Sequence, residues 1–354
     1  MDKAVPLARS ELILGGQKSG KSRRAELLAR EWLARSPDHK AVMIATAQAC
    51  DDVMRQRIAR HQQDREERVP GMQTVEEPVA LGEALARHST AQTIVVIDCL
   101  TLWLTTLLMQ LAVIVVVLGI WQMAATFGWG VKVVVQSPST VFKALVVLAT
   151  GDTLWPNYWA TLKATIVGLL IAVVIGTPLG LLLGLLPTAQ RVVAPFLSAL
   201  NAMPRIALAP VFIIVFGITM YAKVALAVSL VLFIMILNAI AGVSAADSEA
   251  VRMMATLGAS KAQTLRMVVL PAAMPSILTG VRLGLIYSLL GVIASELIAS
   301  ADGLGQLIAK SAGVFDLATV YAVLFLLMVT AALFNSVSEY IGRRLLQWQP
   351  PTAH

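Results

Sequence analysis

Residues 248–296 read SEAVRMMATLGASKAQTLRMVVLPAAMPSILTGVRLGLIYSLLGVIASE, and this stretch decides the fold. It starts with charged and small residues, turns at the LGAS sequence of 257–260, and then becomes almost continuously apolar. About 20 apolar residues are enough for a helix to cross a bilayer. The stretch therefore predicts a water-facing helix–turn–helix loop, residues 244–275, that leads directly into a membrane helix at about 277–298.

The composition of the whole chain is that of a membrane protein. Of its 354 residues 57% are hydrophobic and 14% are charged, whereas about a quarter of the residues in a soluble protein are charged. The charged residues gather in residues 1–98, so two kinds of segment share the chain. The net charge of +7 suits basic residues kept on the cytoplasmic side. We expect no nucleic-acid partner, because no basic patch with interleaved aromatic residues occurs.

Two negative expectations follow from the cysteines and from the first residues. Cys50 and Cys99 give neither a disulfide framework nor the spacing of metal ligands, so no metal site is predicted. The sequence Met1-Asp2-Lys3-Ala4 lacks the apolar core of a signal peptide.

Apolar runs predict about six membrane spans. The first is expected in 100–127, where residues 102–109 would supply its cytoplasmic half. The others are expected at about 161–186, 196–216, 222–243, 277–298 and 318–337. The loops that would lie inside hold Arg191, Arg252, Lys261, Arg266, Arg343 and Arg344, and those outside hold Lys132, Lys143 and Lys310. This bias of basic residues places the N-terminus and the 244–275 loop in the cytoplasm.

Three polar residues within the spans are candidates for a solute pathway: Arg205, Asn238 and Glu296. Charged groups are costly in lipid and often functional there. A structural alternative stays open for each one. Arg205 could reach the interface, Asn238 could form a helix–helix hydrogen bond, and Glu296 lies near the outer interface.

Glycines at every fourth position, Gly176, Gly180 and Gly184, share one face of the predicted 161–186 helix. Small residues at this spacing allow a second helix to approach closely, although glycines are also simply common in membrane helices. Pro178 between them predicts a kink.

The N-terminal residues carry a phosphate-binding pattern. Residues 12–14 predict a short buried strand, and the following Gly-x-x-x-x-Gly-Lys-Ser pattern leads into a helical stretch at 23–35. Glycines let backbone N–H groups surround a phosphate, and a helix N-terminus adds partial positive charge. Lys21 would reach the terminal phosphates and Ser22 the Mg²⁺ ion.

Two further strands are predicted, at 41–45 and 93–98, and Asp98 ends the second one where a Mg²⁺-associated carboxylate is typical. The predicted nucleotide site thus comprises Gly15, Gly16, Gln17, Lys18, Ser19, Gly20, Lys21, Ser22 and Asp98. A chance glycine-rich turn is the less favoured alternative.

These residues resemble the adenosylcobinamide kinase/guanylyltransferase family of cobalamin biosynthesis. The matching stretches are 15–22, 44–48, 57–61, 74–78 and 98–105. The resemblance implies ATP or GTP with Mg²⁺ as ligand and His61 as the nucleotidyl acceptor, although by itself the sequence shows only a lone His on a polar helix.

The family's domain continues with further strands and an Asn/Gly-rich active-site segment, which are absent after Thr105. Residues 1–99 are therefore expected to be a truncated P-loop α/β segment, with weak nucleotide binding at most and without full kinase or transferase chemistry. Residues 102–109 cannot both pack on a sheet and enter the membrane. We therefore expect either a poorly packed N-terminal segment or a short, tilted first helix.

The opening stretch resembles the cytoplasmic coupling loop of ATP-binding-cassette (ABC) importer permeases. Gly258 is followed by nine residues, then Val268, one residue, and Leu270-Pro271. The resemblance continues through 303–305, covers about 111–349, and is closest to permeases of the nitrate/sulfonate/bicarbonate type. It implies a mainly α-helical, type-1 ABC importer permease fold in the bacterial cytoplasmic (inner) membrane. The ATPase-coupling residues would be Glu249, Arg252, Gly258, Ala259, Leu270 and Pro271.

The 244–275 loop departs from the family in one place. The family usually has Glu-Ala-Ala six to four residues before the glycine, where this chain has Arg252-Met253-Met254. Glu249 lies about one helical turn too early to replace that Glu. The reversed charge would change the salt-bridge partner on the ATPase.

Three functional hypotheses remain. The first is a permease subunit that catalyses no reaction and needs no cofactor. It would form a homodimer over two separate ATPase subunits, with a periplasmic or extracellular solute-binding protein outside, and would import a small nitrate-, sulfonate- or taurine-like solute. The second is a membrane-tethered, nucleotide-dependent cobinamide kinase. The third is a gene fusion in which at most one half works. The domains would be 1–99, the seam and first span at 100–127, and the permease at 128–349.

Overall fold

The computed structural model describes residues 10–15, 19–46, 65, 67–127 and 136–346. The chain divides into two compact units, Met1–Ile120 and Trp121–His354, and each is described by itself. Three residues of the predicted nucleotide site, Gly16, Gln17 and Lys18, and the predicted nucleotidyl acceptor His61 lie outside the described residues.

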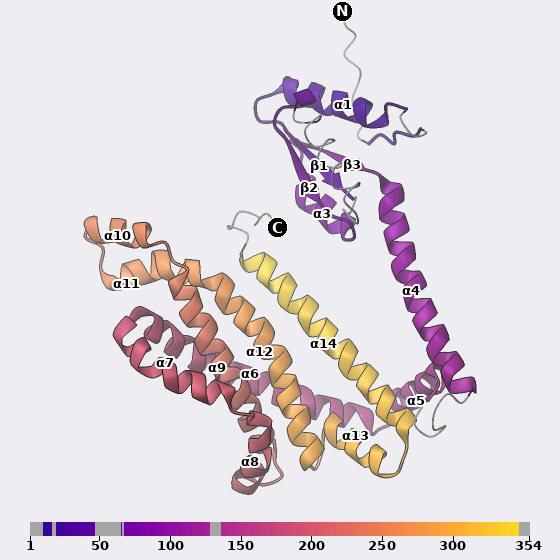
Figure 1. Cartoon of the computed structure of the whole chain (residues 1–354), viewed down its shortest axis with the longest axis vertical. Coiled ribbons are helices and arrows are strands. Elements are labelled where there is room, and N and C mark those ends of the chain that lie inside the picture. The colour runs from indigo at the N-terminus through magenta and orange to yellow at the C-terminus, as the bar shows by residue number, and fades with distance from the viewer. Residues whose placement is uncertain (1–9, 16–18, 47–64, 66, 128–135, 347–354) are drawn as a thin grey trace, which may run out of the picture. The chain divides into compact units, whose positions relative to one another are not determined.

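Unit 1 is built on a small parallel sheet of three described strands. Its elements are α1 (Lys21–Arg35), β1 (Lys40–Ala45), β2 (Met72–Glu76), α3 (Leu81–His88) and β3 (Thr93–Asp98). The strand order is β2-β1-β3, with Ala41 opposite Met72 and Ile94. Apolar residues alternate between the faces, so α1 packs on one side and α3 on the other (Figure 1). β1 lies in the centre, which explains why it is the most buried strand.

The prediction of a strand at 12–14 is wrong. These residues form no strand, and Leu12 and Leu14 are 69% and 81% exposed. The third strand is β2 instead, whereas the strands predicted at 41–45 and 93–98 are confirmed. A three-residue edge strand can form few ladder hydrogen bonds, each worth about 1 kcal/mol net. Ordering each backbone residue costs about 1–2 kcal/mol.

Helix α4 (Leu100–Phe127) begins almost directly after β3. Cys99 takes a left-handed backbone conformation at the junction, with φ +62°. The helix has 28 residues, and none of them is buried. Of the 102–109 segment, Trp103 still contacts the sheet cluster, and its Nε1 donates to the Val79 carbonyl at 2.9 Å. At 1.5 Å per residue α4 is about 42 Å long, so the alternative of a short first helix is wrong.

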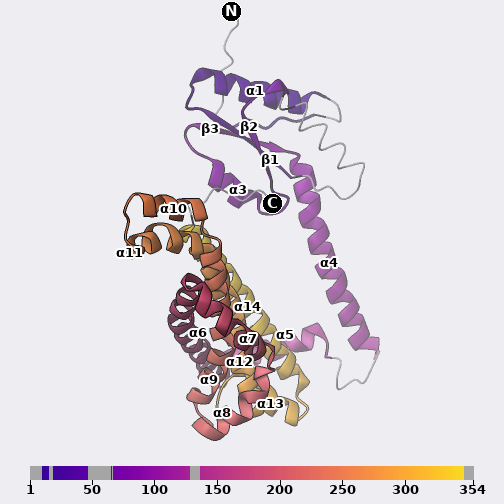
Figure 2. The ribbon, with the colours of Figure 1, turned by 60° about the vertical axis from the view of Figure 1, so that its left-hand side comes forward.

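All described secondary-structure elements of unit 2 are helices. It contains α5 (Pro138–Thr150), α6 (Leu154–Leu185), α7 (Pro187–Ala202), η1 (Arg205–Leu208), α8 (Ala209–Phe216), α9 (Met220–Ser244), α10 (Ser248–Thr256), α11 (Lys261–Thr264), η2 (Leu265–Val269), α12 (Leu270–Ile298), α13 (Leu304–Gly313) and α14 (Leu317–Leu345). Figures 1 and 2 both show α10 and α11 at one end of this unit and α8 and α13 at the other.

Five described helices are long and apolar enough to cross a membrane. They are α4, α6, α9, the segment Lys261–Ile298, and α14. The pair Pro187–Ala202 and Arg205–Phe216, bent by 78°, brings the number to six if it counts as one span. The break between Ala202 and Arg205 lies within the third predicted span, 196–216. Residues 138–150, between the first two predicted spans, also form a helix.

The glycine face predicted on α6 is confirmed as a helix-packing surface. A Cβ atom on Gly180 would lie 2.5 Å from the Ile236 carbonyl oxygen of α9 and 2.6 Å from Ala239 Cβ. Gly176 and Gly184 meet α9 in the same way. Side chains of α6, α9 and α12 then form the core of unit 2, with Met235 fully buried at its centre.

Candidate functional site

The 244–275 loop is a helix–turn–helix whose ends are capped by its own residues. Asp247 Oδ1 accepts a hydrogen bond from the Glu249 N–H at 2.8 Å and caps α10. At the other end, the Ala259 N–H donates to the Met254 carbonyl at 3.0 Å, and the Gly258 N–H donates to Ala255 at 3.1 Å. This is a Schellman motif, in which the glycine takes the left-handed conformation.

Gly258 is therefore the turning point of the loop. Its φ is +75°, and no heavy atom would lie within 4 Å of a Cβ placed there. The constraint at this position comes from the backbone alone.

The second helix of the loop continues into the bundle. Ser260 Oγ accepts from the Gln263 N–H at 3.3 Å, and Gln263 Oε1 accepts from the Ser260 N–H at 2.7 Å, so both sides of a capping box are present. From there α11, one π-helical turn (η2) and α12 form a single helical segment of 38 residues, Lys261–Ile298. The predicted membrane helix thus begins well before residue 277.

The predicted coupling residues fall into two groups. Glu249, Arg252 and Gly258 are exposed and Ala259 is half-buried, all on α10 or the turn. Leu270 and Pro271 are half-buried at the start of α12, and Leu270 packs against the core of unit 2.

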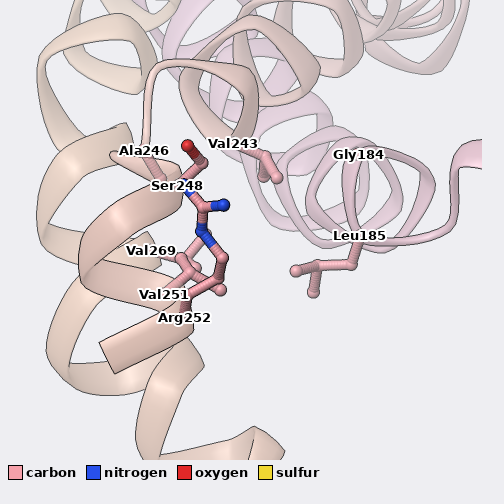
Figure 3. Close-up of a pocket in the computed structure, with 8 residues that line it drawn as sticks. All are labelled: Gly184, Leu185, Val243, Ala246, Ser248, Val251, Arg252 and Val269. Atoms are coloured by element: carbon pink, nitrogen blue, oxygen red, sulfur yellow. The ribbon is translucent and has the colours of Figure 1, made fainter. Parts of the chain in front are cut away.

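An open hollow of about 520 Å³ lies between the loop and the ends of α6 and α9. Figure 3 shows the Arg252 side chain running alongside Ser248, on the side that faces Val243. The lining residues are Gly184, Leu185, Val243, Ala246, Ser248, Val251, Arg252 and Val269. Arg252 therefore lies at the root of the loop, beside the bundle.

Sequence reasoning missed three exposed apolar side chains on this loop. Met253, Leu257 and Met267 are 57%, 73% and 66% exposed. Their signal was present in the sequence, because large apolar residues in a water-facing loop indicate a surface that a partner covers.

Arg205 does not line an open surface of unit 2. Its side chain is buried at 7% exposure. The guanidinium donates to the carbonyls of Ser229, Leu230 and Leu200 and to Asn201 Oδ1 at 2.9–3.2 Å, and it lies 4.0 Å above the Phe233 ring. The residue thus connects the break between α7 and η1 to α9, and the alternative of a side chain that reaches the interface is wrong.

Glu296 is the centre of a buried polar cluster. Its carboxylate accepts from Thr161 Oγ1 at 2.9 and 3.0 Å, from Lys223 Nζ at 3.1 Å and from the Gly305 N–H at 2.9 Å. Lys223 Nζ also donates to Asp302 Oδ1 at 2.5 Å. We call Thr161, Lys223, Glu296, Asp302 and Gly305 the Glu296 cluster.

The Glu296 cluster joins α6, α9, α12 and α13. Glu296 is 1% exposed and Lys223 is 3% exposed. Gly303, with φ +110°, packs so closely that a Cβ there would overlap the carboxylate. Glu296 therefore holds helices together in this structure. Sequence reasoning named the Glu296 carboxylate but missed Lys223. A lysine at the start of an apolar run could have indicated a buried partner for that carboxylate.

Asn238 forms a hydrogen bond within its own helix. Its Nδ2 donates to the Ile234 carbonyl at 2.8 Å, one turn earlier in α9. The hydrogen bond to another helix that was expected for Asn238 is not found among the described residues. The backbone of α12 approaches its side chain, because a Cβ on Gly280 would lie 2.9 Å from Asn238 Cβ.

Six residues of the predicted nucleotide site are described: Gly15, Ser19, Gly20, Lys21, Ser22 and Asp98. Gly20 has φ +84° and precedes α1, which starts with Lys21 and the exposed Ser22. The Lys21 amino group donates to the Gly15 carbonyl, and Asp98 ends β3 as expected. The loop is not held by a preceding strand, because residues 12–14 lie outside the sheet. Gly20, Lys21 and Ser22 at the start of α1 therefore agree with the predicted pattern, whereas the strand predicted before Gly15 is not present among the described residues.

Two families match the chain in two places. Residues 11–137 match "Cobinamide kinase / cobinamide phosphate guanyltransferase", and residues 176–347 match "Binding-protein-dependent transport system inner membrane component".

Individual relatives agree with this division. The taurine transport system permease protein TauC of Escherichia coli (strain K12) is 33% identical over 247 residues, which are 68% of this chain and 89% of TauC. The riboflavin transport system permease protein RibX of Chloroflexus aurantiacus is 31% identical over 67% of this chain and 88% of RibX. The bifunctional adenosylcobalamin biosynthesis protein CobP of Pseudomonas aeruginosa is 50% identical over 100 residues, only 28% of this chain and 53% of CobP.

Proposed function

The chain belongs to the binding-protein-dependent transport system inner membrane components, the permease subunits of ABC importers, and from this premise we propose that the 244–275 loop is where a separate ATPase drives the import of a small sulfonate-like solute. The observation that carries the proposal is the unbroken helical segment Lys261–Ile298. A displacement applied to α11 reaches α12 within one helical segment, and α10 is joined to α11 by the capped turn at Gly258.

The contact with the ATPase would combine charge and apolar area. Glu249 and Arg252 supply charges, and Met253 and Leu257 supply exposed apolar surface on the same loop. Methionine adapts its shape to a partner surface because its side chain is unbranched and flexible. We expect Arg252→Glu to change the affinity for the ATPase, and an unchanged affinity in a pull-down assay would show that the interface does not use this charge.

The assembly that we propose has two copies of this chain over two ATPase subunits, with a solute-binding protein on the outer side. The chain is a multi-pass membrane protein. We place its N-terminus and the 244–275 loop in the cytoplasm, where ATP is available, on the bias of basic residues in the loops. Labelling of Ser260 or Lys261 from outside the cell would contradict this orientation.

The solute class is proposed on the relatives. TauC is named for taurine, whose charged groups are an ammonium and a sulfonate, whereas RibX is named for riboflavin. We propose a small oxyanion of the nitrate, sulfonate or taurine class.

The N-terminal unit supports a weaker, second proposal. The positive end of α1, with Lys21 and Ser22 in place, favours weak binding of ATP or GTP with Mg²⁺. Kinase or guanylyltransferase activity is not proposed, because the chain spans about half the length of its curated relative CobP. A radiolabelled nucleotide trapped covalently on His61 would contradict this view. Sequencing of the transcript across codons 100–115 would test for a joined pair of gene fragments.

The transport proposal is tested by reconstituting the full chain with its ATPase and binding protein in proteoliposomes. Gly258→Ala forces a side chain into the left-handed conformation, at a cost of about 1–2 kcal/mol. We expect it to lower ATP-dependent taurine uptake while the protein still inserts. Gly71→Ala is the matched control, since Gly71 has φ +90° and nothing within 4 Å of an added Cβ but lies outside the loop. Equal losses of uptake in both variants would contradict a special role for the 244–275 loop.

A further inference from the structure

Arg282 is a basic residue of a described span, and its guanidinium is hydrogen-bonded to the protein on one side only. It lies on α12, sixteen residues before Ile298, which is about 24 Å along the helix axis. With Ile298 taken as one end of the span, a hydrocarbon layer of about 30 Å includes Arg282, toward the end that carries the 244–275 loop. Unlike Arg205 and Lys223, it is exposed on the surface of the unit.

Only one side of the Arg282 guanidinium is used by the protein. Nε donates to Asn335 Oδ1 of α14 at 2.7 Å. An arginine has five N–H donors, and within the described residues the four on Nη1 and Nη2 have no acceptor. The Nη groups of Arg205, in contrast, have four acceptors between them. Asn335 thus sets the orientation of the Arg282 guanidinium and leaves its two-pronged side open.

The protein supplies no counter-charge for this group in the described structure. Glu296 is committed to Lys223, and Glu339, about one turn beyond Asn335 on α14, makes no ion pair with Arg282. The surroundings are apolar, since Leu283 and Ile286 on the same helix are each 40% exposed. A permanent positive charge in apolar surroundings is costly without a partner, so an anion from outside the chain would stabilise it.

We propose that Arg282 binds an oxyanion, either the sulfonate of a solute or the phosphate of a lipid headgroup, through Nη1 and Nη2. A guanidinium matches two oxygens of such a group with two parallel hydrogen bonds, which a lysine cannot do. As a solute site this deepens the proposed function and rests on it, because it assigns the oxyanion class to a named side chain near the cytoplasmic end of the bundle.

The test uses the full chain in phosphatidylcholine nanodiscs, without ATPase, and equilibrium binding of ³⁵S-labelled ethanesulfonate. We expect Arg282→Gln to weaken binding about tenfold or more, the equivalent of one lost charge-assisted hydrogen bond. Arg282→Lys should retain part of the affinity, and Asn335→Leu should lose less than Arg282→Gln. The matched control is Lys163→Gln. Lys163 is an exposed basic residue nine residues after the start of α6, and its loss should leave binding unchanged.

A second arm separates the two sources of the oxyanion. Native mass spectrometry in nanodiscs that also contain phosphatidylglycerol counts the lipids retained by each variant. Loss of retained phosphatidylglycerol with unchanged ethanesulfonate binding would assign the site to a headgroup, and the reverse result would assign it to a solute. If Arg282→Gln behaves like the unmodified protein with both probes, the proposal is wrong. A separate pull-down of the ATPase shows whether the importer assignment itself fails.

Discussion

Removal of the Lys223 ammonium should destabilise unit 2 more than any other single change in the Glu296 cluster. Lys223 and Glu296 are joined at 3.1 Å, and their side chains are 4% and 0% exposed. In Lys223→Met the carboxylate keeps its neutral donors, Thr161 and the Gly305 N–H, but loses the positive charge beside it. Breaking a buried pair by removing one partner costs about 3–5 kcal/mol.

The size of the effect can be checked by thermal unfolding of the full chain in detergent, followed by tryptophan fluorescence. For a body of 150–250 residues a change of about 1 kcal/mol shifts Tm by roughly 2–4 °C, so we expect a decrease of roughly 6–20 °C. Asp302→Asn is the matched control, because this partner is 62% exposed and such a pair contributes about 1 kcal/mol or less.

A double variant distinguishes lost attraction from lost packing. In Lys223→Met/Glu296→Met both charges are absent, so no unpaired charge remains in the core, and we expect much of the lost Tm to return. The reasoning is refuted if Lys223→Met lowers Tm no more than Asp302→Asn, or if the double variant is as unstable as the sum of the two single variants.

Two pairs of glycine substitutions, each a test with its control, measure how closely the helices pack. Gly303→Ala should lower Tm clearly, because its Cβ would overlap the Glu296 carboxylate at a φ of +110°, whereas Gly313→Ala, which has open surroundings, should have little effect. Gly180→Ala should destabilise the α6–α9 contact by about 1–3 kcal/mol, as overpacking does in other cores. Gly119→Ala in α4 meets no neighbour and should be neutral. Equal Tm values for Gly180→Ala and Gly119→Ala would contradict close α6–α9 packing.

Some elements were predictable because their causes are local in the chain. Ser260 and Gln263 cap a helix through atoms three residues apart, and Gly258 supplies the left-handed turn that any helix end of this type requires. The long spans were predictable because the solvation of about 20 consecutive apolar residues depends little on their neighbours. The four-residue spacing of glycines on α6 likewise identified a packing face, although not the helix that occupies it.

The errors occurred where the outcome depends on distant residues. Residues 12–14 are apolar enough for a strand, but strand formation requires a pairing partner. In the described sheet, whose order is β2-β1-β3, residues 12–14 pair with no strand. Asn238 was expected to form a hydrogen bond across helices, yet its Nδ2 donates to the Ile234 carbonyl of its own helix.

By itself the sequence predicted the membrane helices of the permease part and the turn at residues 257–260, because hydropathy and turn formation depend on a few neighbouring residues. Only the tertiary structure decided what the charged groups do. Arg205 and Glu296 are held by acceptors and donors that lie 4–25 and 9–135 residues away in the chain, respectively, while Arg282 keeps an open side. The physical reason is that the role of a charge inside a membrane protein depends on which partners lie within about 3 Å of it, and folding alone brings those partners together.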